Sequence, residues 1–262
     1  MKNEGSSKRK LSKRKDPEAA VSFYHEEGFP IESVLEYLLN IANSNFEDWR
    51  RNNPNTSLWE FPFKLDKMGN SGALFDLVKL TDMSKNVISA MTSERIYKEV
   101  LNWSKEFDKP FAETLVKNQE KVTKFLNIDR TGKKPRKDIS KWSEVKSTLT
   151  YIIDNNFSYD FPENISTEEI KNIIEKYSQV YNHNDTKEEW FNRIKDFSES
   201  LGYAKDTKLY KQNPESYKGS ITDTSTVIRV SLTGRKQTPD LYEIIQVLGY
   251  EETITRFNRV FK

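Results

Sequence analysis

Apolar residues recur at three- to four-residue spacing through most of this chain, and this feature most restricts its fold. The segment IESVLEYLLNIANS shows it most clearly. Its apolar stripe consists of Val34, Leu35, Leu38, Leu39 and Ile41. Such spacing predicts an amphipathic helix. The period-two alternation typical of strands occurs only at about 58–64 and 226–232. We therefore predict a mainly α fold with little β structure.

Capping residues and helix breakers indicate where helices begin and end. In DPEAAVSFYHEEG, Asp16 is expected to cap a helix that Gly28 ends. Near the C-terminus, Pro239 is expected to open a helix that Gly249 ends. Between these regions the pattern predicts helices at about 81–90, 93–107, 109–128, 140–155, 166–181 and 185–201.

The composition excludes several kinds of site. The 262 residues include no cysteine, so disulfides, thiolate metal sites and a cysteine nucleophile are impossible. The two histidines, His25 and His183, lie far apart in the sequence, and we expect no metal site. No apolar run is long enough to span a bilayer, and no signal-peptide core follows the basic N-terminus. We expect a cytoplasmic protein with no membrane partner.

A basic motif stands near the N-terminus, within KRKLSKRKDPEAA. Its core, KLSKR at 10–14, resembles the KMSKS signature of class I aminoacyl-tRNA synthetases, in the variant typical of glutamyl-tRNA synthetases. Two further blocks are similar to segments of bacterial glutamyl-tRNA synthetases: KMGNSGALFDLVKLTDMSKNVIS at 67–89 and IRVSLTGRKQTPDLYEIIQVLG at 228–249. The three blocks occur in the order found in that family.

The resemblance implies a C-terminal portion of such an enzyme, in which helical anticodon-binding domains form a helix cage. It divides the chain into a KMSKS-like loop remnant at 1–15, a stem-contact region at 16–92, and two helical anticodon-binding parts at 93–184 and 185–262. No HIGH-like signature and no glycine-rich turn of a Rossmann fold are found in the sequence.

By resemblance, the KMSKS-like motif would contact ATP. The residues concerned are Lys10, Leu11, Ser12, Lys13 and Arg14, and chiefly Lys13. A flexible lysine suits this role because negative charge builds on the phosphates as pyrophosphate leaves. A solvated basic tail is the alternative reading of the same residues.

By resemblance, the last block would face the tRNA anticodon through Arg229, Thr238, Pro239 and Leu241. Unpaired anticodon bases can be splayed out, stacked and read at their edges by an arginine or by backbone amides. Arg235 and Lys236 would hold backbone phosphates. The alternatives are a helix start and core role for Pro239 and Leu241, and plain solvation for the two charges.

The full-length enzyme implied by the resemblance would join glutamate to its tRNA with ATP and Mg²⁺. We expect this chain alone to lack ligase activity, to carry no catalytic residue and to bind no cofactor. Its expected partner is tRNA, that of glutamate and, as an open alternative, that of glutamine. We expect a monomer that does not bind DNA. A stand-alone tRNA-binding module and a helical protein-interaction scaffold are the competing hypotheses.

Overall fold

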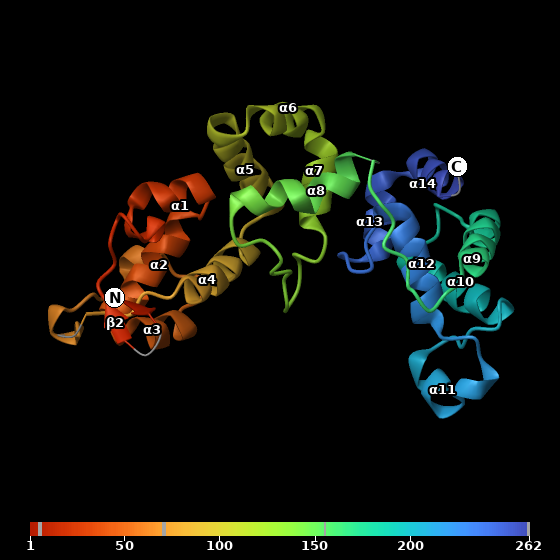
Figure 1. Cartoon of the computed structure of the whole chain (residues 1–262), viewed down its shortest axis with the longest axis horizontal. Coiled ribbons are helices and arrows are strands. Elements are labelled where there is room, and N and C mark those ends of the chain that lie inside the picture. The colour runs from red at the N-terminus through yellow and green to blue at the C-terminus, as the bar shows by residue number, and fades with distance from the viewer. Residues whose placement is uncertain (5–6, 70–71, 155, 261–262) are drawn as a thin grey trace. The chain divides into compact units, whose positions relative to one another are not determined.

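The computed structural model describes the chain except for residues 5–6, 70–71, 155 and 261–262, and its elements are mostly helices (Figure 1). The chain forms two compact units. Unit 1 comprises Met1–Lys117 and Arg130–Ser147, and unit 2 comprises Asn118–Asp129 and Thr148–Lys262. The mainly α prediction is confirmed, since the strands in the described part form one short hairpin. No described helix is both long and apolar enough to cross a membrane.

Unit 1 consists of helices, 3₁₀ turns and the hairpin. Its elements are β1 (Lys2–Glu4), β2 (Ser7–Arg9), η1 (Pro17–Ala19), α1 (Val21–Glu27), α2 (Ile31–Ala42), α3 (Phe46–Asn52), η2 (Leu58–Glu60), η3 (Leu65–Lys67), α4 (Leu77–Ser89), α5 (Ser93–Phe107), α6 (Lys109–Lys117) and η4 (Trp142–Glu144). Helix α2 packs against α4, and α5 packs against α6. The first contact buries Tyr37 and Leu80 together with Phe29, which follows α1.

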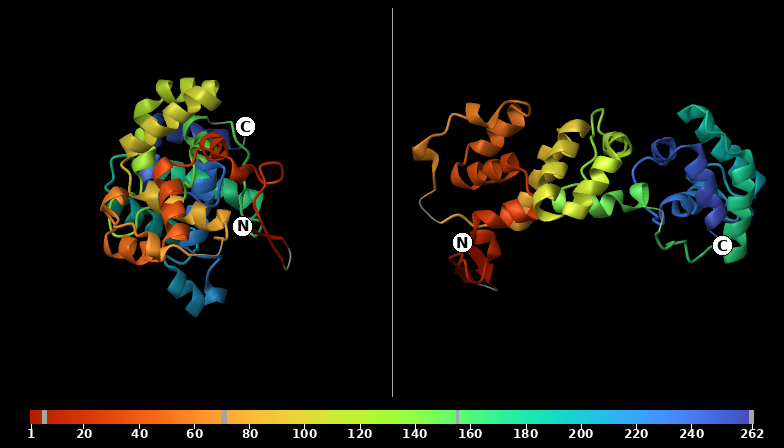
Figure 2. Two further views of the ribbon diagram at one scale, coloured as in Figure 1. Left: turned by 90° about the vertical axis from the view of Figure 1, so that its left-hand side faces the viewer. Right: turned by 90° about the horizontal axis from the view of Figure 1, so that it is seen from above.

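Unit 2 packs its helices around α12. Its elements are α7 (Gln119–Asn127), α9 (Thr167–Val180), α10 (Lys187–Ser200), α11 (Thr207–Gln212), η5 (Pro214–Ser216), α12 (Ile221–Thr233), α13 (Leu241–Leu248) and α14 (Tyr250–Arg259), and α8 (Val145–Ile153) begins in unit 1 and ends in unit 2. Helices α9, α10 and α14 all contact α12 (Figures 1 and 2). The buried Arg256 guanidinium donates to the carbonyl oxygens of Tyr151 and Leu232, which ties α14 to two neighbouring helices.

Both strand predictions are wrong. The segment at 58–64 contains η2, and 226–232 lies inside α12. Val227, Ile228 and Val230 are all fully buried in α12. A helix that is buried on several sides does not need a single apolar stripe, so its β-branched residues imitate a strand pattern.

Several of the predicted helices have different bounds, since α4 begins at Leu77 and α8 at Val145, and two regions differ more strongly. The helix predicted at 109–128 is divided into α6 and α7 at Asn118, where the chain passes from unit 1 to unit 2. Asp16 is followed by the 3₁₀ turn η1, its side chain caps no helix, and α1 begins only at Val21. Gly28 does end α1, with the φ of 81° that glycine adopts readily.

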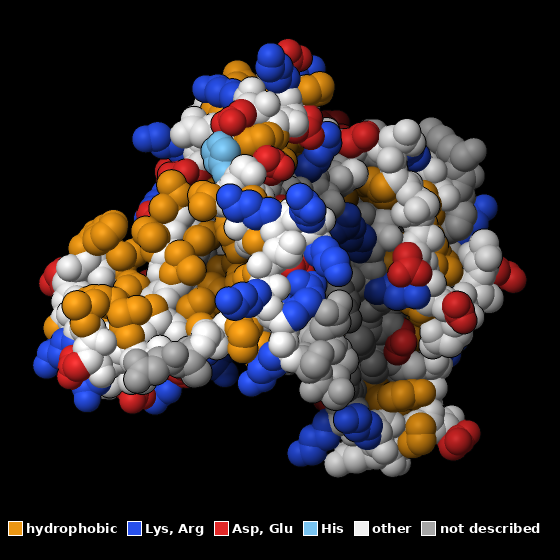
Figure 3. Space-filling model, turned by 60° about the vertical axis from the view of Figure 1, so that its left-hand side comes forward, with side chains coloured by type: hydrophobic (Ala, Val, Ile, Leu, Met, Phe, Trp, Pro, Cys, Tyr) orange, Lys and Arg blue, Asp and Glu red, His pale blue; other side chains and the backbone are white. Residues whose placement is uncertain are grey.

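Unit 1 exposes many large apolar side chains. Trp59 is 79% exposed, and Leu38 of the predicted stripe is 47% exposed. Among the residues that the structure describes, ten of the fifteen exposed large hydrophobic side chains fall between Val21 and Val78. Figure 3 shows hydrophobic side chains gathered over much of the face of unit 1 in that view. Gathered apolar side chains of this kind are typical of contact surfaces.

Candidate functional site

The KMSKS-like motif lies in the connection from β2 to η1, in unit 1. We call Lys10–Lys15 the basic loop. The backbone amides of Lys15 and Asp16 donate to the carbonyl oxygen of Ser12 at 2.9 and 2.8 Å. These bonds form a tight turn that holds the second half of the basic loop in one shape.

The cationic side chains of the basic loop point into solvent. Lys10, Lys13 and Arg14 are exposed, and none of them forms an ion pair with another described residue. Leu11 and Ser12 are half-buried. The structure therefore leaves the predicted phosphate-contacting charges accessible to an anion, while the two uncharged residues of the motif lie closer to the protein.

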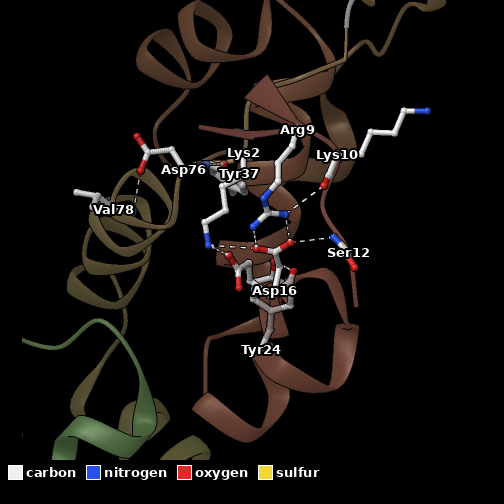
Figure 4. A network of polar contacts seen from close by, with 10 residues as sticks. Lys2, Arg9, Lys10, Ser12, Asp16, Tyr24, Tyr37, Asp76 and Val78 are labelled. Atoms are coloured by element: carbon white, nitrogen blue, oxygen red, sulfur yellow. Dashed lines mark hydrogen bonds and ion pairs between the residues drawn. The ribbon is translucent and has the colours of Figure 1, made fainter. Parts of the chain in front are cut away.

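The buried carboxylate of Asp16, which is 1% exposed, directly follows the basic loop and also binds the residue that precedes it, Arg9. Arg9 donates to it from Nη1 at 2.5 Å and from Nη2 at 2.7 Å, and the Ser12 amide donates to it at 2.9 Å (Figure 4). The Arg9 guanidinium is the main reason why the pKa of Asp16 lies well below its usual value. Asp16 therefore remains an anion under all ordinary conditions.

The second predicted site forms a cleft of about 800 Å³ in unit 2. We call it the Arg229 cleft. Its lining includes Asp129, Lys187, Trp190, Phe191, Ser225, Arg229, Thr238, Pro239, Asp240 and Leu241. All four residues predicted to contact the anticodon are thus brought together, although they come from α12, the following turn and α13.

Arg229 is half-buried and held by the turn after α12. Its Nη1 donates to the carbonyl oxygen of Thr238 at 3.2 Å and to Thr238 Oγ1 at 3.0 Å. Its Nε and Nη2 have no acceptor among the described residues. Burial lowers the pKa of Arg229 from its usual value, yet an arginine still carries its charge at neutral pH. The cleft thus presents a fixed cation with unused donors.

Pro239 and Leu241 lie on either side of Asp240, the N-cap of α13. Asp240 caps this helix by accepting from the amide of Glu243, so Pro239 lies just before the cap and does not open the helix. Leu241 is 4% exposed and belongs to the core. The core reading therefore holds for Leu241, the helix-start reading is wrong for Pro239, and both residues border the cleft.

Residues of α10 complete the cleft, and sequence reasoning did not identify them. Lys187 Nζ lies 2.9 Å from Asp240 Oδ2, and Phe191, one turn further on, is 48% exposed. The only available signal was the spacing of four between a cation and an aromatic residue at the beginning of a capped helix. Their approach to Arg229 arises from tertiary packing.

Arg235 and Lys236 do not line the Arg229 cleft. The Arg235 guanidinium lies 5.2 Å from the centroid of the Tyr151 ring. Lys236 Nζ lies 2.8 Å from Asp160 Oδ1, and both side chains of this pair are exposed. Exposed ion pairs of this kind are weak, so Lys236 can exchange its partner for a phosphate at little cost.

A known protein family matches the larger part of the chain. Residues 95–261 match the family described as "Anticodon binding domain". The chain belongs to this family. The match begins within α5 and includes every residue that lines the Arg229 cleft.

Curated relatives confirm the resemblance to glutamyl-tRNA synthetases. The chain is 48% identical, over 99% of its length, to a glutamate–tRNA ligase of Clostridium perfringens (strain SM101 / Type A). It is 44% identical, again over 99%, to one of Acetivibrio thermocellus. In both cases it spans 48% of the relative, so the chain covers about half the length of the curated relatives that it matches.

A solved structure shows the same fold. The glutamate tRNA ligase of Elizabethkingia meningosepticum matches 99% of this chain and 49% of its own, with a TM-score of 0.64 and 19% identity. This likeness supports the helical architecture and carries no information about individual site residues.

Proposed function

We propose that this chain is the tRNA-recognition portion of a glutamate–tRNA ligase, and that the Arg229 cleft contacts the anticodon. The observation that carries the proposal is the position of Arg229, half-buried in a cleft inside the region that matches the anticodon binding domain family. Its Nε and Nη2 groups are directed donors that can reach the edge of an unpaired base.

Other groups of the Arg229 cleft suit an unpaired base. The exposed Phe191 ring offers a surface on which a base can stack. Lys187 can leave its ion pair with Asp240 to meet a phosphate. The cleft thus combines edge recognition, stacking and charge, which is the combination that sequence-specific readers of single-stranded RNA use.

The basic loop fits the phosphates of ATP in the full-length ligase. The exposed Lys10 and Lys13 carry positive charge on a turn that is itself held in place, and phosphate oxygens are the natural partners of such groups. ATP with Mg²⁺ would supply the activating chemistry when bound. We propose that this chain alone lacks ligase activity, because the glutamate pocket would belong to the other half of the enzyme.

Several finer assignments remain part of this proposal. They include the boundaries of the stem-contact region (16–92) and of the anticodon-binding parts (93–184 and 185–262), charging of the glutamine tRNA, and a monomeric state. Arg235 and Lys236 would contact the RNA backbone from beside the cleft.

A titration with tRNA tests the proposal. The chain is titrated with transcripts of glutamate tRNA, glutamine tRNA and an unrelated tRNA at two salt concentrations, and binding is followed by fluorescence anisotropy. Glutamate tRNA should bind most tightly, and every affinity should fall as salt rises, because phosphate contacts release counterions. Equal affinity for all three transcripts would remove the anticodon role and leave a non-specific RNA-binding module.

A further inference from the structure

The Asp16 carboxylate connects the N-terminal hairpin to the basic loop. It binds the Arg9 guanidinium through both of its oxygens and the Ser12 amide through one, and Lys2 Nζ lies 3.5 Å away (Figure 4). Lys2 also pairs with Glu18, whose side chain is 7% exposed. A single buried anion thus holds the hairpin before the basic loop and a backbone amide within it.

The hairpin register explains why such an anion is needed. Strands β1 and β2 are antiparallel, and Lys2 lies directly opposite Arg9. Two like charges at opposite positions in a ribbon destabilise it. Here both cations lie beside Asp16, and Lys2 is shared with Glu18, so the repulsion is replaced by a mixed cluster of two cations and two carboxylates.

We propose that Asp16 is a positioning residue that holds the basic loop in the shape in which Lys10 and Lys13 meet a phosphate chain. The inference rests on the proposed phosphate contact of the basic loop. Asp16 itself touches no phosphate. Its carboxylate fixes Arg9 on one side of the loop and the Ser12 amide in the middle, so that the cationic side chains are left exposed on a turn of defined shape.

A positioning role and a plain electrostatic role predict opposite effects on anion binding. Asp16→Asn removes a negative charge next to a cluster of cations, which by simple electrostatics strengthens the binding of an anion. If Asp16 positions the loop, the same substitution weakens anion binding, because the loop loses its shape. The sign of the change therefore separates the two roles.

Limited digestion with trypsin measures two quantities: the rate at which the basic loop is cleaved and the protection that a bound anion gives it. Trypsin cleaves after lysine and arginine, so mass spectrometry of the peptides ending at Lys10, Lys13 and Arg14 reports how often the loop opens. In Asp16→Asn we expect cleavage in the loop to become about tenfold faster, as expected when a charged hydrogen-bond network is lost. Inorganic tripolyphosphate should protect the wild-type loop, and about fivefold more of it should be needed in the variant.

Matched variants keep the test interpretable. Asp82→Asn removes an exposed carboxylate of α4. It should change neither the rate of cleavage in the basic loop nor the protection by tripolyphosphate. Arg9→Lys keeps the charge but loses the two-pronged contact, and it should behave like a milder Asp16→Asn, so it replaces that variant if the latter does not fold. Circular dichroism melting confirms that the helices remain intact.

The outcomes decide the proposal. Faster cleavage together with weaker protection supports it. Unchanged cleavage, or protection that is unchanged or stronger in Asp16→Asn, overturns it. Absence of protection in the wild-type chain also overturns it, together with the phosphate contact of the loop. The affinity for glutamate tRNA of the wild-type chain and of Arg229→Ala, measured in the same series, reports on the Arg229 cleft separately.

Discussion

The basic loop of unit 1 and the Arg229 cleft of unit 2 both present cations, but they hold them in different ways. In the basic loop, Lys10, Lys13 and Arg14 extend into solvent, and the ordering comes from a buried anion beneath them. In the cleft, the Arg229 side chain is half-buried and fixed by the turn that contains Thr238.

This difference shows what each site can recognise. Exposed lysines on a short turn can neutralise phosphate charge, but they cannot distinguish one base from another. A half-buried guanidinium with fixed direction, next to an exposed ring and a helix start, can read an edge and exclude alternatives. One site is thus suited to charge and the other to identity.

The turn from α12 to Thr238 begins at Gly234, where a substitution gives the largest expected effect. This residue ends α12 with a φ of 73°, and a Cβ placed there would lie 2.4 Å from the Ser158 carbonyl oxygen and 2.6 Å from the Phe157 ring. Gly234→Ala should lower the free energy of unfolding by about 3 kcal/mol, through backbone strain and overpacking. Chemical denaturation followed by tryptophan fluorescence measures this loss.

Gly202→Ala is the matched control for that experiment. Gly202 also lies in unit 2 and has a φ of 87°, but a Cβ there would meet nothing closer than 3.8 Å. We expect a cost of about 1 kcal/mol from backbone strain alone. Equal losses in the two variants would contradict the claim that the turn after α12 is packed tightly against the 157–158 segment.

A smaller effect is expected when the pH is lowered. The contact between Asp16 and the basic loop should be lost only in strong acid. Because Arg9 lowers the pKa of Asp16, the contribution of this contact is complete above the unfolded-state pKa of about 4 and is lost as the pH falls through the folded-state value. The amide signal of Ser12, which donates to Asp16, should therefore stay unchanged from pH 7 to pH 4 in NMR spectra. A midpoint at or above pH 4 would show that the contact is not formed in solution.

Local sequence signals predicted most of the helices, because caps and apolar spacing act within one or two turns. Thr92 caps α5 and Ser166 caps α9, at the beginning of the helices predicted at 93–107 and 166–181, and Gly28 ends α1. The prediction failed where tertiary packing decides. Helix α12 is buried on several sides, and its Val and Ile residues therefore imitated a strand.

The candidate sites show the same limit. The KLSKR motif and the block at 228–249 marked residues that are close in sequence, and the structure gathers them in two places. Lys187 and Phe191 reach the cleft from a helix more than thirty residues earlier in the chain, so no local pattern indicated them. Asp16 was expected to cap a helix, because an aspartate before a proline fits that role, whereas its actual partners lie on the N-terminal side.

The measurement that tests the central claim most directly compares Arg229→Ala with Lys13→Ala on glutamate tRNA transcripts whose anticodon bases are changed one at a time. Arg229→Ala should weaken binding of the unchanged transcript by roughly ten- to a hundredfold and remove the preference for one anticodon base, whereas Lys13→Ala should preserve the whole pattern of preferences. If Arg229→Ala instead weakens binding to all transcripts equally, Arg229 contacts the RNA backbone, and the distinction between a site for charge and a site for identity is contradicted.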